Sequence, residues 1–202
     1  MYKSGYSVNI FKILERDVID FLNYIPIDYY IDSKRKNIYS PRLAELLIRI
    51  GSQIDTFFRN WVIVHEIYNK KNKKQLNDVY DLKFSNFKDI ESDKKVILSN
   101  KEIKIIATDE IITPFLYWTD KRYPLWWDAY NKVKHNGFIY KSDGNLLNVI
   151  ESLSALFLLN CIHNETEIIL LEEQIRKRGI RGIDSKGKIL GNIRSELFEF
   201  RR

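Results

Sequence analysis

Cysteine, histidine and proline are scarce in this chain. Its 202 residues include one cysteine, three histidines and four prolines. The lone Cys161 cannot form an internal disulfide, and its place in an apolar run predicts a buried thiol and a cytoplasmic protein. The longest apolar run, near residues 155–162, is too short to span a bilayer, and no signal-peptide pattern opens the chain. We therefore expect a single domain and no membrane partner.

The common signatures of metal and cofactor sites are also missing from the sequence. The histidines and the cysteine show no spacing typical of zinc ligands. No phosphate-binding loop, dinucleotide-binding fingerprint or nucleophile elbow is present. We therefore expect neither a metal nor a cofactor, and we look for chemistry among the side chains themselves.

The formal charge of +6 is concentrated at the C-terminal end. Residues 176–202 hold nine Lys or Arg and three Asp or Glu, so the first 175 residues are neutral overall. Such a basic tail is compatible with nucleic-acid contact, with docking on a partner or with a solvated end. Because it also carries large apolar side chains such as Leu197, Phe198 and Phe200, we expect it to dock on the body or on a second subunit.

What the chain does have is helical periodicity. Apolar residues recur every three or four positions over about 7–24, 41–68 and 146–162, which predicts three long helices. Ser40 and Asp143 are placed to cap the second and third of these at their N-termini. Gly51 inside the second predicts a close helix crossing. Shorter helices are expected over 75–90, 125–136 and 165–178.

Two β-branched runs, 95–98 and 102–107, are separated by Ser-Asn-Lys, which predicts a β-hairpin. The predicted fold is therefore mainly α: an antiparallel helical bundle with a small inserted β-hairpin at about 95–107. We divide the chain into this bundle, residues 1–175, and the basic C-terminal tail, 176–202.

The segment Pro124–Asn136 (PLWWDAYNKVKHN) is the most informative part of the chain. If it is helical, then Trp127, Asn131, Lys134 and His135 share one face. A polar cluster beside large aromatic side chains is unusual for a plain surface helix, so chemistry is best sought here.

The residue types on this face suit metal-free RNA cleavage. A histidine exchanges protons near neutral pH, so His135 can serve as the base for a ribose 2′-hydroxyl. Asn131 can orient the ring or bind a phosphate oxygen, and Lys132 and Lys134 can neutralise a phosphate. The alternative interpretation is that His135 and Asn131 only hydrogen-bond a neighbouring helix.

The run Trp127-Asp-Ala-Tyr-Asn-Lys-Val-Lys-His135, followed by an apolar helix, resembles the signature helix of the HEPN superfamily. Many of these small helical domains are RNases of toxin–antitoxin, abortive-infection and CRISPR-linked defence systems. The family motif is Arg, a polar residue that is often Asn, a few residues, and then His. Asn131 and His135 match the last two positions. Tyr130 stands where the family has Arg, which contacts the scissile phosphate in active members, and tyrosine supplies no cation. The resemblance covers roughly residues 40–165.

The resemblance implies a homodimer with the His135 helices facing each other and a protein that acts on RNA in bacterial defence, in a toxin–antitoxin system or in stress. It would be a metal-independent endoribonuclease or an RNA binder, and an antitoxin or another protein would be a further partner. The catalytic candidates are His135, Asn131 and Lys134, and the candidate RNA contacts are Lys132, Arg59, Trp127 and Tyr130. The alternative function is a non-catalytic helical dimerisation or protein-interaction module with a degenerate site, in which the tryptophans only anchor the core.

A second match to the HEPN motif lies in the long predicted helix. There Arg59, Asn60 and His65 fit the pattern of Arg, a polar residue and a later His. Arg59 and His65 are about 120° apart around a helix and so do not share a face. One interpretation is structural, with Arg59 in an ion pair and His65 at the core margin. In the other, antiparallel packing brings Arg59 to His135, where it supplies the cation missing at Tyr130.

Overall fold

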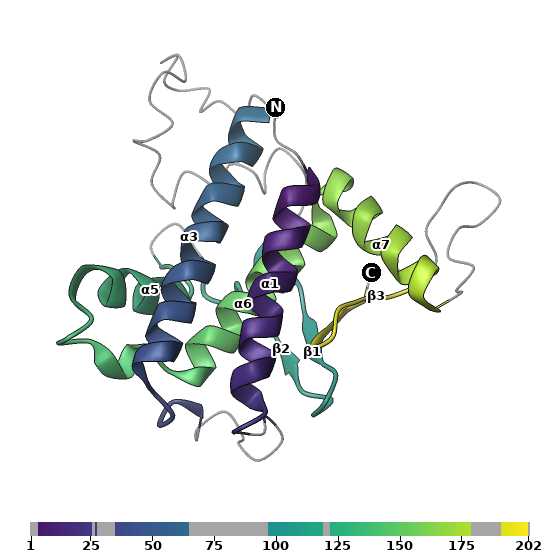
Figure 1. Cartoon of the computed structure of the whole chain (residues 1–202). Coiled ribbons are helices and arrows are strands. Elements are labelled where there is room, and N and C mark those ends of the chain that lie inside the picture. Colours follow the sequence, from purple (N-terminus) through teal and green to yellow (C-terminus); the bar gives the residue numbers. More distant parts are fainter. Residues whose placement is uncertain are drawn as a thin grey trace, which may run out of the picture.

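The computed structural model describes residues 4–25, 27, 35–64, 97–118, 122–178 and 191–201. The helices are α1 (Ser4–Leu22), α3 (Pro41–Val64), α5 (Leu125–Asn136), α6 (Leu146–Ile162) and α7 (Asn164–Arg178), with short 3-10 turns η4 (Leu98–Asn100) and η5 (Lys141–Asp143). The strands are β1 (Ile103–Ile105), β2 (Ile111–Ile112), β3 (Ile193–Arg194) and β4 (Phe198–Phe200). The prediction of a mainly helical protein with a small β element is confirmed (Figure 1).

Helix α6 forms the centre of the core and contacts α1, α3, α5 and α7 (Figure 1). Its residues from Leu146 to Cys161 are buried except for the half-buried Glu151, as its nearly continuous apolar sequence predicts. Its buried Asn160 is satisfied locally, because the side chain donates to the Leu156 carbonyl and accepts from Ser7 Oγ at 2.9 Å each. The cap predicted at Asp143 is wrong. Asp143 ends the turn η5, and Asn145 is the residue whose side chain accepts from the Asn148 N–H, at 3.0 Å.

No single helix among the described residues is long and apolar enough to cross a membrane. In the described ranges, one pair of helix segments, Leu146–Ile162 of α6 and Thr166–Gln174 of α7, meets that requirement when taken together, and the pair is bent by 95°.

Helix α3 begins as predicted, with Ser40 Oγ accepting the Leu43 N–H at 3.2 Å. The last residues of the predicted helix 41–68 and the whole predicted helix 75–90 lie outside the described residues. Near its start α3 passes so close to Gly144 that a Cβ there would lie 2.6 Å from Ala44 Cβ. The loop after α5 is therefore held against the beginning of α3.

The predicted pairing of the hairpin is wrong. Leu98–Asn100 forms the turn η4, and β1 instead pairs antiparallel with β2 further along the chain. The chain reverses after β1 at Asp109, whose φ of 59° is in the left-handed region. The other edge of β1 pairs with β4, so the four-stranded sheet has the order β2-β1-β4-β3. Local sequence could not foresee this sheet, because half of its strands lie about ninety residues further along the chain.

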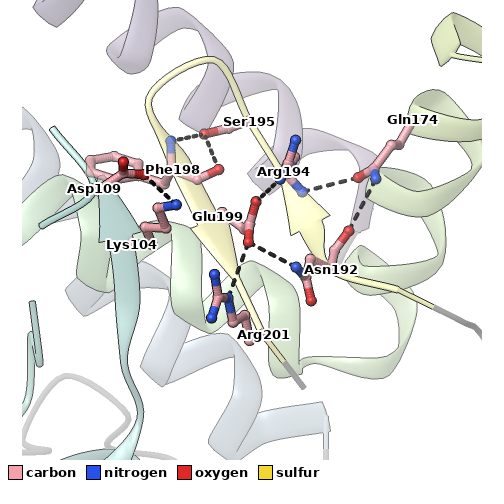
Figure 2. Close-up of polar contacts among 9 residues, drawn as sticks. All are labelled: Lys104, Asp109, Gln174, Asn192, Arg194, Ser195, Phe198, Glu199 and Arg201. Carbon is pink, nitrogen blue, oxygen red and sulfur yellow. Dashed lines mark hydrogen bonds and ion pairs between the residues drawn. The ribbon is translucent and has the colours of Figure 1, made fainter. Parts of the chain in front are cut away.

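The described end of the basic tail packs on the body as the β3–β4 hairpin. Phe198 of β4 stacks on Phe157 of α6 with ring centroids 5.8 Å apart. The Leu197 N–H donates to the buried carboxylate of Glu15 on α1 at 3.0 Å. Gln174 of α7 accepts the Arg194 N–H at 3.0 Å and donates to the carbonyl of Asn192, directly before β3, also at 3.0 Å (Figure 2).

A buried carboxylate joins the strands of this hairpin (Figure 2). Glu199 is 2% exposed, forms an ion pair with Arg194, and accepts from Arg201 Nε at 3.3 Å and Asn192 Nδ2 at 2.7 Å. Burial alone raises the pKa of Glu199, but hydrogen bonds and charges from Arg201 and Arg194 outweigh it and hold the pKa below its usual range. Part of the positive charge of the tail is thus neutralised inside the fold.

Candidate functional site

One side of helix α5 is anchored in the core by aromatic side chains. Trp126 donates from Nε1 to the Pro114 carbonyl at 2.6 Å. Trp127 and Tyr130 pack against each other with ring centroids 5.0 Å apart, and they are only 6% and 2% exposed. Both were candidate RNA contacts. The structure places both rings in the core, so neither face is accessible for a base to stack on.

Tyr130 of α5 packs against α3. Its ring lies against Gly51, where a Cβ would be 2.5 Å from Tyr130 Cγ, so the close crossing expected at this glycine is present. Its hydroxyl is 3.4 Å from Ser52 Oγ and accepts from Lys134 Nζ at 3.1 Å. The ammonium group of Lys134 therefore lies at the hydroxyl end of the Tyr130 ring.

The polar residues predicted to accompany the tyrosine lie on the outside of α5. The His135 side chain is exposed, and no hydrogen bond or ion pair joins its imidazole to another residue in the described ranges. Asn131 donates to the Trp127 carbonyl of its own helix at 2.9 Å. Lys132 pairs with Asp128 at 2.7 Å, and this hydrogen bond raises the pKa of Lys132. Asn131, Lys132, Lys134 and His135 therefore share one helix, but their side chains do not hydrogen-bond to one another.

Only part of the second candidate motif, Arg59, Asn60 and His65, lies within the described residues. Arg59 is half-buried and forms a two-contact ion pair with Asp55 one turn earlier, at 2.8 and 3.1 Å. Asn60 is also half-buried, and His65 lies outside the described residues. An ion pair for Arg59 agrees with the structural interpretation of this motif.

Helices α3 and α5 pack on each other, but this packing does not bring Arg59 to His135 within one chain. Gly51 meets Tyr130, and further along α3 Phe58 packs on Phe115, which packs on Trp126. Arg59 therefore lies toward the beginning of α5 and His135 toward its end. With a rise of about 1.5 Å per residue, Arg59 lies about 12 Å along α3 from the contact between Gly51 and Tyr130, and His135 lies about 8 Å along α5 from it.

Sequence reasoning missed the apolar side chains at the two ends of α5. Just after the helix, Phe138 is 98% and Ile139 69% exposed, next to the exposed Tyr140. At its beginning, Leu125 is 57% exposed and borders a surface hollow of about 210 Å³. The Phe-Ile-Tyr run directly after Gly137 was the available signal, since three large apolar residues in a loop are unusual.

Within the described ranges, no group of three or more His, Cys, Asp or Glu side chains is arranged to hold a metal ion. Comparison with known proteins finds no matching family model, curated protein or solved structure.

Proposed function

We propose that this protein acts on RNA through the outer face of α5, as the resemblance to HEPN domains implies. The observation that carries the proposal is the exposed imidazole of His135 on the helix that also carries Lys132, one turn earlier, and the exposed Lys134 directly before it. An accessible histidine next to cations suits both phosphate binding and proton transfer.

The proposed reaction is an intramolecular transesterification of an RNA phosphodiester. His135 takes the proton from a ribose 2′-hydroxyl, the 2′-oxygen bonds to the adjacent phosphorus, and the bond to the 5′-oxygen breaks. The leaving oxygen takes a proton from water or from the imidazolium. Lys134 replaces the family arginine, because its Nζ lies 3.1 Å from the hydroxyl of Tyr130, which occupies the arginine position.

The test is incubation of single-stranded RNA and tRNA with the protein in EDTA, with analysis of product ends and a parallel binding titration against salt. We expect 2′,3′-cyclic phosphate ends that are lost in His135→Ala. Lys134→Ala should lower affinity and reduce the slope of log K against log salt by about 0.7, as for one lost contact to a single strand. The matched control, Arg16→Ala, removes an exposed cation from α1.

Arg59→Ala separates the two motif hypotheses in the same assay. Because Arg59 is bound to Asp55 and lies far from His135 along the helices, its removal should leave cleavage and affinity unchanged. Absence of both binding and cleavage by the folded wild-type protein would reject the RNA proposal.

A second candidate function is the non-catalytic interaction module. The observation that favours it is Tyr130, which is buried against Gly51 and supplies no cation at the family arginine position. Binding of RNA without cleavage would leave the domain as a binder, and absence of RNA binding would favour the interaction module.

A further inference from the structure

The loop that follows α5 presents one aromatic ring almost entirely to solvent. Phe138 is 98% exposed, so both faces of its ring are open. Gly137 keeps a helical backbone conformation, with φ −62° and ψ −21°, and Phe138 therefore continues the helical path for one more residue. Because residues three apart are neighbours on a helix, Phe138 lies one turn beyond His135 on the same side.

Hydrogen bonds fix the shape of this loop. Asn136 accepts twice, from the Ile139 N–H at its side-chain oxygen (3.3 Å) and from the Tyr140 N–H at its carbonyl (3.1 Å). Further along, the Tyr140 carbonyl accepts the Asp143 N–H at 3.0 Å. Since the loop is already held in place, little conformational entropy is lost when a ligand binds to the ring of Phe138.

Lysines flank the exposed ring in the sequence. Residues 132–141 include three lysines, Lys132, Lys134 and Lys141, and no aspartate or glutamate. Lys132 pairs with Asp128 at 2.7 Å, whereas the side chains of Lys134 and Lys141 are exposed. The segment is thus suited to contact a polyanion.

A single-stranded nucleic acid fits this composition better than a protein partner does. Lysine is depleted in protein–protein interfaces, and their buried centres exclude charge. Proteins that bind single strands combine a positively charged path for the backbone with aromatic rings on which bases stack. Both parts are present between Lys134 and Lys141. In a double helix the bases are already stacked on one another, so they do not reach such a ring.

We propose that Phe138 is a stacking platform for an unpaired RNA base, and that Lys134 and Lys141 contact phosphates of the same strand. The proposal rests on the proposed RNA function and adds its substrate class, because a strand must offer an unpaired base at this point to be held beside His135. Phe138 binds the base and positions the strand, whereas proton transfer stays with the imidazole of His135.

The affinity for a labelled single-stranded RNA of mixed sequence, measured by fluorescence anisotropy, tests the platform. Phe138→Ala should weaken binding by about 5- to 140-fold, the loss that corresponds to one stacked base. The slope of log K against log salt should stay unchanged, because no phosphate contact is lost, whereas Lys134→Ala should reduce it. The affinity for duplex RNA of the same sequence should not change in Phe138→Ala.

Two matched variants distinguish stacking from a general apolar contact. Phe138→Tyr keeps the ring and should keep the affinity of the wild type. Phe138→Leu keeps an apolar side chain without a ring, so it should weaken binding about as much as Phe138→Ala. The control Tyr24→Ala removes another aromatic side chain, which is 85% exposed but lies beyond the end of α1, and should leave the affinity unchanged. Because all these side chains are exposed, thermal unfolding should be the same in every variant.

The outcomes separate stacking from the proposed function. If the wild type binds RNA and Phe138→Ala binds it equally well, the stacking platform is rejected while the RNA function stands. Wild-type affinity in Phe138→Leu would indicate an apolar contact, such as a protein partner makes, and would equally overturn stacking. Failure of the folded wild type to bind any single strand rejects both proposals. If the wild type cleaves RNA, Phe138→Ala should raise KM and still give cyclic phosphate ends, whereas His135→Ala should give no product.

Discussion

The ring of Tyr130 lies directly on the backbone of Gly51, where a Cβ atom would come within 2.5 Å of Cγ and 2.8 Å of Cε2. This contact sets the distance between α3 and α5. It also places the Tyr130 hydroxyl within reach of Ser52 and Lys134. Tyr130 therefore serves as a packing residue, and the cation that contacts its hydroxyl comes from the next turn of the same helix.

Gly51→Ala should destabilise the protein although alanine favours a helix. The propensity gain is about 1 kcal/mol, whereas overpacking typically costs about 1–3 kcal/mol and here involves an aromatic ring with little freedom to move. Urea unfolding should show a lower midpoint with an unchanged m-value. Gly5→Ala is the control, since its Cβ would meet nothing closer than 4.0 Å, and its midpoint should stay unchanged or rise. In a Tyr130→Ala background the cost of Gly51→Ala should disappear.

The ion pair between Arg35 and Glu110 should contribute strongly to the fold. Arg35 is 1% exposed, and its Nη2 lies 2.7 Å from the carboxylate of Glu110, which precedes β2. Glu110→Ala should cost about 3–5 kcal/mol, because it leaves a guanidinium charge buried without this carboxylate. Asp17→Ala breaks the partly exposed pair with Arg49 at 2.6 Å and should cost at most about 1 kcal/mol. Similar losses in both variants would contradict a burial effect.

Glu15 should make the protein less stable as the pH rises. Burial raises the pKa of Glu15, and hydrogen bonds from Ser195 and the Leu197 and Glu196 backbone only partly oppose this. A folded-state pKa above the unfolded value means that the folded state binds more protons, so stability falls as pH rises from the ordinary glutamate range through the folded pKa. Glu15→Gln keeps an acceptor for the Leu197 N–H and should flatten this part of the stability profile. An unaltered profile in chemical unfolding between pH 4 and 8 would contradict the assignment to Glu15.

Glu199 should have the opposite pH dependence. Its pKa is lowered because Arg201 and Arg194 outweigh the effect of burial. Its contribution is therefore present above the ordinary glutamate range and is lost as pH falls through the depressed folded pKa. Glu199→Gln should destabilise the protein near pH 7 and have progressively less effect in acid. Thermal unfolding of the wild type and variant across this range measures the difference, and a constant difference would argue against the charge as its cause.

Much of the helical structure was predictable from the sequence. The beginning of α3, both ends of α5, the Ser40 cap and the burial of α6 and Cys161 all follow from periodicity, capping preference and apolar content. The position of the Trp127–His135 run on a helix was equally predictable. These features depend on neighbours within a few turns, which the sequence displays directly.

The arrangement of the candidate site was less predictable. The sequence shows that Trp127, Asn131, Lys134 and His135 can share one side of a helix, but it does not show which part of that side faces the core. In the structure Trp127 is buried, whereas Lys134 and His135 are exposed. That division depends on where α3 and α6 pack, because their side chains cover part of the α5 surface.

The sequence by itself determined a mainly helical chain, the position of its most apolar helix and the helical segment that joins tryptophan, asparagine, lysine and histidine side chains. Only the tertiary structure decided that β1 pairs with the distant β4, that Tyr130 is buried on Gly51, and that Arg59 and His135 lie toward opposite ends of α5. Local preferences extend over a few residues, whereas strand pairing and helix crossing depend on contacts between segments far apart in the chain. The physical reason is that burial of apolar surface selects these contacts from all the faces that the helices and strands offer.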